Sequence, residues 1–150
     1  MKLANNITLR VFCNPEDDCE KVKRSLETLS TFTEEEQKKE KIQTEEIKAK
    51  GLEENIIKIL TTTLEKDRHC NQFLKDLKEQ LSETDRKLLV EQTNRLDDNL
   101  NFFIRLDKKS LLENRYELTD SGDCFHIKIN IAAFPRNKYE AHKVVKEIFS

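Results

Sequence analysis

A run of seven residues near the end of the chain, 125–131, alternates without a break between apolar and polar side chains. The apolar members are Phe125, Ile127, Ile129 and Ile131, and the polar members are His126, Lys128 and Asn130. A period of two is typical of a β-strand that buries one face and leaves the other in water, whereas a helix repeats its apolar residues every three or four positions. The run therefore predicts a sheet with one covered face and one open face.

Other segments of the chain carry a strand pattern as well. Residues 7–11 and 100–106 also alternate, and residues 56–64 consist mainly of the β-branched residues Ile and Thr, which favour strands. A shorter strand is expected at residues 115–118, before the turn predicted by Asp120-Ser121-Gly122-Asp123. Short connections between these late strands favour antiparallel pairing.

Apolar residues recur at helical spacing in the segments 19–29, 70–81, 88–96 and 141–148. The expected N-terminal caps are Asn14 (followed by Pro15), Asp67, Ser82 and Asn137. Helices with one apolar stripe are stable when they pack on the apolar face of a sheet. A length of 150 residues suits one domain. We therefore expect residues 1–150 to form a single α+β domain of two layers, with a largely antiparallel sheet and the helices on one face.

The segment 33–50 leaves two interpretations open. Its mixed charges over residues 33–40 indicate a solvated loop, although local propensity would accept a helix as far as Lys50. Only Ile42 and Ile47 are large apolar residues there, so such a helix would have almost no face to bury.

The sequence offers little for catalysis or metal binding. Gly51 and Gly122 are its only glycines, which excludes glycine-rich phosphate loops, and it contains no C-x-x-C or H-x-x-x-H pair. The four cysteines show no dense, clustered spacing, and no stretch is long and apolar enough for a signal or a membrane span. We expect a cytoplasmic protein with reduced thiols, without a cofactor, a metal or an enzymatic activity.

If helices cover one face of the sheet, the open face carries the alternate strand residues. These are Thr8, Arg10, Phe12, Asn101, Phe103, Arg105, Asp107, His126, Lys128 and Asn130. Cations that pair with phosphates beside aromatic rings that stack on bases are typical of single-strand recognition on a sheet. In this hypothesis Arg10, Arg105 and Lys128 contact phosphates and Phe103 stacks on a base. The adjacent Lys108, Lys109 and Arg115 would add contacts to the RNA backbone.

Two alternatives stay open at this point. Mixed polar side chains on a solvated antiparallel face are ordinary and need no ligand. The chain would also suit a protein-interaction module or a homodimer with no nucleic-acid role, which the acidic stretch 34–54 and the net charge of −2 favour.

Several segments resemble the signature of an archaeal family of small predicted RNA-binding proteins, described as predicted exosome subunits. The resemblance lies in the stretch from Phe102 to Ser110, then in Tyr116-Glu117-Leu118, and then in the stretch from Phe125 to Ile129. Residues 7–12 and 20–22 are similar to the first strand and helix of the family. The resemblance implies an α+β fold like that of ribosomal protein L5, a strand around residues 41–47, and a non-catalytic RNA-binding protein that acts as an accessory to RNA processing or to the exosome.

The chain departs from that family pattern in two places. Residues 51–55 keep Gly51 and Asn55 of a G-H-x-G-N-P-like loop but lack its other residues. Lys108-Lys109-Ser110 stands where the family has K-Q-A, so only Lys108 is kept. Whether these two segments retain the family function is left open by the sequence.

Overall fold

The alternating run forms the strand β5 (Cys124–Ile131), which lies beside the central strand of a five-stranded sheet. The computed structural model describes residues 1–51, 53 and 55–150. The strand order is β2-β3-β1-β5-β4, and every neighbouring pair is antiparallel. The remaining strands are β1 (Ala4–Cys13), β2 (Gln43–Lys50), β3 (Ile56–Leu64) and β4 (Asn101–Asp107). The α+β fold with a largely antiparallel sheet is confirmed.

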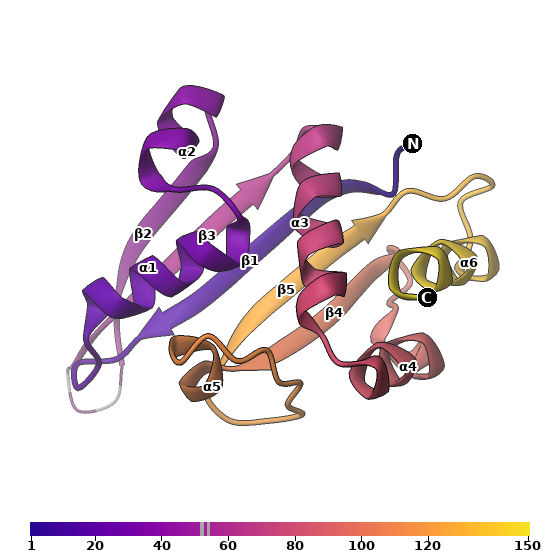
Figure 1. Ribbon diagram of the computed structural model, residues 1–150. Helices are drawn as coiled ribbons and strands as arrows, with labels where there is room; N and C mark the ends of the chain where they lie inside the picture. Colours follow the sequence, from indigo (N-terminus) through magenta and orange to yellow (C-terminus); the bar gives the residue numbers. More distant parts are fainter. Residues whose placement is uncertain (52, 54) are drawn as a thin grey trace.

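Helices cover one face of this sheet and leave the other open (Figure 1). They are α1 (Cys19–Ser30), α2 (Glu34–Glu40), α3 (Asp67–Gln80), α4 (Glu83–Glu91), α5 (Lys108–Leu112) and α6 (Lys138–Phe149), with the short 3-10 helix η2 (Thr93–Arg95) after α4. The core lies between the two layers, where Phe73, Phe102, Phe125 and Phe149 are among the largest fully buried side chains. Burial of each such ring stabilises the fold by about 1.5–3 kcal/mol. The strand faces that carry buried residues therefore point toward the helices, and the alternate residues point to the open face.

Three expected element boundaries differ from the structure. Helix α1 is capped by Asp18, whose side chain accepts from the Lys21 backbone N–H, and not by Asn14. Asp67 is the first residue of helix α3 and not its cap. Lys66 occupies the cap position, and its side chain makes no capping hydrogen bond. Helix α4 ends at Glu91, so Leu96 lies beyond it. Ser82 and Asn137 are caps, as expected.

The strand expected at residues 115–118 was wrong. The segment makes a single bridge, Leu106 to Leu118. The chain instead turns directly from β4 into α5, because the Asp107 side chain accepts from the backbone N–H and the hydroxyl of Ser110 and caps the helix.

The segment 33–50 contains both a helix and a strand. Thr33 and Glu36 form a reciprocal capping box that begins α2. Because residues 34–40 are helical, the solvated-loop interpretation of residues 33–40 was wrong. The edge strand β2 then pairs with β3, so a helix as far as Lys50 was wrong as well, and the strand implied by the family resemblance is confirmed. Nearly every side chain of β2 is exposed, which explains why no apolar period marks it.

The expectation of reduced thiols was also wrong for one pair of cysteines. Cys13, the last residue of β1, and Cys19, the first residue of α1, form a disulfide. Cys70 and Cys124 are free and buried. Among the residues that the structure describes, no helix is long and apolar enough to cross a membrane.

Candidate nucleic-acid interface

The open face of the sheet carries a shallow hollow of about 290 Å³ over β1, β5 and β4. Its lining consists of Thr8, Arg10, Phe12, Phe103, Ile104, Arg105, His126, Ile127 and Lys128. The register brings these residues together, because Arg10 is opposite His126, and His126 is opposite Arg105. Four of the predicted RNA-binding residues, Arg10, Phe103, Arg105 and Lys128, therefore lie side by side.

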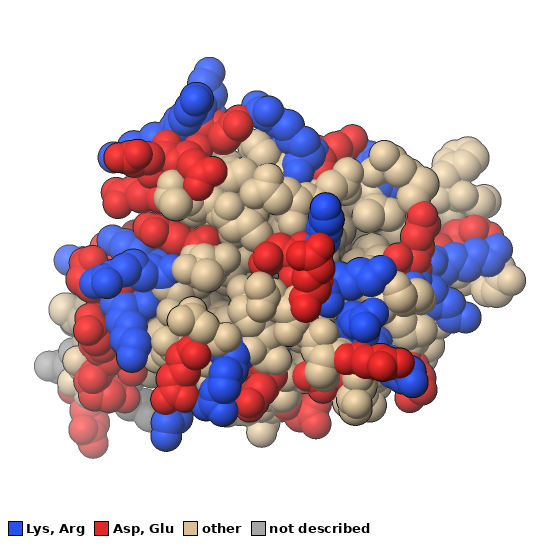
Figure 2. Space-filling view, viewed as in Figure 1, with Lys and Arg blue, Asp and Glu red and all other residues tan. Residues whose placement is uncertain are grey.

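The hollow is positively charged. Arg10, Arg105 and Lys128 contribute cations, and no described residue of its lining is acidic. The Arg10 guanidinium lies over β3, where its Nε donates to Thr61 Oγ1 at 3.4 Å. On the opposite, helix-covered side of the molecule, acidic and basic side chains are intermixed (Figure 2). The excess of positive charge is therefore local to the hollow, because the whole chain is slightly acidic.

Two phenylalanine rings give the hollow its apolar surface. Phe12 is 40% exposed and Phe103 is 42% exposed, at opposite sides of the hollow. The ring centroids of Phe12 and His126 lie 6.1 Å apart and the rings are tilted by 45°. Partly exposed rings beside arginines can stack on unpaired bases.

His126 and Cys124 lie two positions apart on the same face of β5, and both side chains are neutral. Burial, with the nearby charges of Arg105 and Arg10, lowers the pKa of His126. Burial raises the pKa of the Cys124 thiol, whose Sγ lies 3.5 Å from His126 Nε2. A thiol with a raised pKa is a poor nucleophile, so this pair suits a binding surface better than a catalytic one.

A second hollow of about 510 Å³ lies along the outer edge of β4. It shares Phe103 and Arg105 with the first, and its other lining residues are Gln92, Asn94, Arg95, Thr119 and Asp120. Sequence reasoning missed Arg95 because it treated residues 88–96 as one helix. The side chain of Arg95 is held in place, since its Nε donates to Gln92 Oε1 at 2.6 Å and its Nη1 to the Phe103 carbonyl at 3.1 Å.

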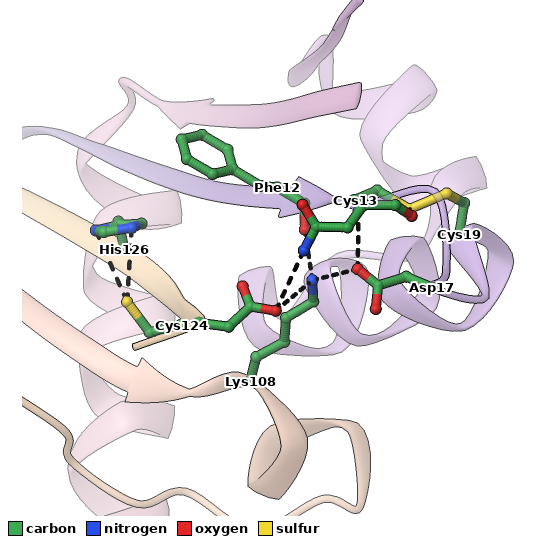
Figure 3. A network of polar contacts seen from close by, with 9 residues as sticks. Phe12, Cys13, Asp17, Cys19, Lys108, Cys124 and His126 are labelled. Atoms are coloured by element: carbon green, nitrogen blue, oxygen red, sulfur yellow. Dashed lines mark hydrogen bonds and ion pairs between the residues drawn. A yellow bond between two sulfur atoms is a disulfide. The ribbon is translucent and has the colours of Figure 1, made fainter. Parts of the chain in front are cut away.

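Lys108 does not lie on the surface where a phosphate contact was expected. Its side chain is 3% exposed, and its Nζ donates to the Phe12 carbonyl at 2.6 Å, to Asp17 Oδ2 at 2.7 Å and to Asp123 Oδ2 at 3.1 Å (Figure 3). Although burial alone would raise the pKa of Asp17, the hydrogen bonds from Lys108 and from the Asn14 backbone hold it below its ordinary value. An ammonium with three donors has none left over, so Lys108 is a structural residue.

Lys109 and Arg115 are exposed but lie outside the linings of both hollows. The guanidinium of Arg115 is bound by Glu113 at 2.6 Å and by Glu117 at 3.4 Å, which leaves little net charge at that position. These two cations are therefore not brought together with the cations of the open face.

Comparisons with known proteins identify the family to which this chain is similar. A family model described as RNA binding matches residues 6–131. A protein of Pyrococcus abyssi named RNA-binding protein PAB1135 is 34% identical over 145 residues, which cover 96% of this chain and 92% of that protein. The solved structure of Mth689, a DUF54 protein from Methanothermobacter thermautotrophicus, has a TM-score of 0.80 and 27% identity over 99% of this chain and 100% of that one. AF2318 of Archaeoglobus fulgidus shares the fold, with a TM-score of 0.81, 24% identity and coverage of 97% and 99%.

Proposed function

This chain belongs to the family of RNA-binding proteins, and we propose that it binds single-stranded RNA through the open face of its sheet. The observation that carries the proposal is the single hollow in which three cations and two half-exposed phenylalanine rings meet. Arg10, Arg105 and Lys128 would pair with phosphates, while Phe103 and Phe12 would stack on bases.

Single-stranded RNA suits this surface better than duplex RNA. Stacking on Phe12 or Phe103 requires a base that has left its own stack. The bases of an A-form duplex are stacked inside the helix, and its major groove is too narrow for side chains to read. An open face about three strands wide, each strand roughly 4.8 Å from the next, can instead carry a short extended strand of RNA.

The more detailed parts of this function stay predictions. They are a non-catalytic accessory role in RNA processing, an association with the exosome and a cytoplasmic location. The neutral state of Cys124 and His126 supports a role in binding without chemistry. The likeness to ribosomal protein L5 likewise stays a prediction from the resemblance.

Fluorescence anisotropy with labelled single-stranded and duplex RNA, at several salt concentrations, tests the proposal. Reversal of two open-face charges in the variant Arg105→Glu/Lys128→Glu should abolish salt-dependent binding of the single strand. The matched control is Lys109→Glu/Arg115→Glu, which makes the same charge change outside both hollows and should bind like the wild type. Equal loss in both double variants would mean that binding follows net charge and not the open face.

A specific feature supports a second candidate function, a homodimer or a protein complex. Phe12, Ile59 and Ile47 are opposite one another on β1, β3 and β2, and they form an apolar row at one end of the open face. Ile47 is 53% exposed on the edge strand. A dimer that covers this row would hide part of the RNA surface, and light scattering after size exclusion would detect it as a doubled mass that Ile47→Lys returns to the monomer.

A further inference from the structure

The hollow along the outer edge of β4 is continuous with the proposed RNA surface but differs from it in chemistry. The two hollows share Phe103 and Arg105, so the phenylalanine stands between them. Whereas no described residue that lines the first hollow is acidic, the second contains the carboxylate of Asp120 and the uncharged polar groups of Gln92, Asn94 and Thr119. A base stacked on Phe103 could therefore present its polar edge to the second hollow.

In this second hollow, the guanidinium of Arg95 and the carboxylate of Asp120 are neighbours but do not share a hydrogen bond. Arg95 Nη2 lies 3.9 Å from Asp120 Oδ1, which is longer than a hydrogen bond. Arg95 is fixed by its bonds to Gln92 and to the Phe103 carbonyl, and its side chain is only 14% exposed. The Asp120 side chain is 95% exposed, although its backbone carbonyl is held by Arg105 Nη1 at 3.1 Å.

The donor and the acceptor match the Watson–Crick edge of guanine. Guanine presents an acceptor, O6, next to two donors, N1–H and N2–H, on that edge. A carboxylate accepts two parallel N–H groups, and an arginine donates to a carbonyl oxygen. Uracil, adenine and cytosine each offer a single donor site there, and uracil flanks its donor with two carbonyl oxygens that a carboxylate repels. Of the four bases, guanine alone satisfies Asp120 with two bonds and Arg95 with one.

We infer that the hollow lined by Arg95, Phe103 and Asp120 is a guanine-binding subsite of the RNA surface. This inference rests on the proposed function and adds a base preference to it. Phe103 stacks on the base, the Asp120 carboxylate accepts from N1–H and N2–H, and Arg95 donates to O6. Arg105 bonds the Asp120 backbone and holds the acidic residue beside the stacking ring.

Binding of labelled uridine hexamers that contain a single guanosine, adenosine or no purine tests this subsite. The guanosine hexamer should bind the wild-type protein roughly tenfold more tightly than the other two, the discrimination that one bidentate pair provides. Asp120→Asn should bring the guanosine hexamer to the affinity of the all-uridine hexamer and leave the latter no weaker. Because Asp120 is so exposed, this substitution should not disturb folding.

The matched control is Asp98→Asn, which removes one negative charge from a side chain that is 96% exposed and paired with Lys138. It lies before the start of β4 and outside both hollows, so the guanosine preference should persist. Equal wild-type affinities for the three hexamers, or a preference that survives Asp120→Asn, overturn the guanine subsite while the binding of uridine hexamers still upholds the proposed function. Failure of the wild type to bind any hexamer overturns both.

Discussion

The ammonium of Lys108 donates to the backbone carbonyl of Phe12 at 2.6 Å. Through this bond a buried cation at the start of α5 supports the strand whose exposed ring forms one side of the proposed RNA surface. Asp17 and Asp123 surround the same ammonium (Figure 3), so segments far apart in sequence converge on one charge.

The first prediction concerns this buried cation. Lys108→Met should lower the free energy of unfolding by about 2–3 kcal/mol, because it leaves two carboxylates and a carbonyl without their donor. This is less than the loss of about 3–5 kcal/mol that is typical when one partner of a fully buried ion pair is removed, because both carboxylates keep some contact with water. Urea denaturation measures the change. Lys109→Met, the same substitution at the exposed neighbouring position, should change stability by less than about 0.5 kcal/mol; similar losses in the two variants would argue against a structural role for Lys108.

The disulfide between Cys13 and Cys19 gives a second prediction. Alkylation of the unreduced, denatured protein should label only Cys70 and Cys124, and all the cysteines should react after reduction. Closure of so short a loop should stabilise the fold by about 2 kcal/mol. Reduction should therefore lower the urea midpoint of the wild type and leave that of Cys13→Ser/Cys19→Ser unchanged. Full labelling without a reductant would show that the thiols are free.

His126 gives the proposed interface a pH dependence. Its pKa in the free protein is lowered by burial and by Arg105 and Arg10. Phosphates bound to these arginines would offset their charge, so the pKa should rise in the complex. The complex then takes up a proton, and affinity for single-stranded RNA should increase a few-fold as the pH falls from about 7.5 to 5.5. His126→Gln should remove the increase; a rise of the same size in this variant would place the titrating group elsewhere.

Phe103 is the more exposed of the two rings that line the open-face hollow. Phe103→Ala should weaken the binding of single-stranded RNA by about 1–3 kcal/mol, because a base loses its stacking partner. Phe134→Ala provides the control, since Phe134 is 95% exposed and lies outside both hollows. Isothermal titration of both variants with the same oligonucleotide measures the difference. An unchanged affinity in Phe103→Ala would remove this ring from the interface.

Apolar periodicity explains which parts of the fold could be predicted. Strands β1, β4 and β5 each bury one face against the helices, so their sequences carry the period of two. The open-face positions of Arg10, Arg105 and Lys128 follow directly from that period. Strand β2 buries almost nothing and is held by its pairing with β3, together with a polar chain in which Thr44 bonds Gln37 and Thr62. No local pattern marks such a strand.

Long-range polar contacts explain what the sequence could not reveal. In the sequence, Lys108 is one of two adjacent lysines and has no feature that indicates burial. Its partner Asp17 is 91 residues away in the sequence, so their contact could not be predicted. The Arg95 side chain is positioned by the turn that follows α4 and by its hydrogen bond to the Phe103 carbonyl. These contacts depend on the packing of whole elements, and they decide which cations remain available to a ligand.

The arginine Nε–H signals in an NMR titration with a short single-stranded RNA show directly whether RNA binds to the open face of the sheet. The signals of Arg10 and Arg105, on the open face, should shift on addition of RNA, while those of Arg24 on α1 and Arg86 on α4 should not. Shifts confined to Arg24 and Arg86 would place the RNA on the helical side and contradict the proposed interface.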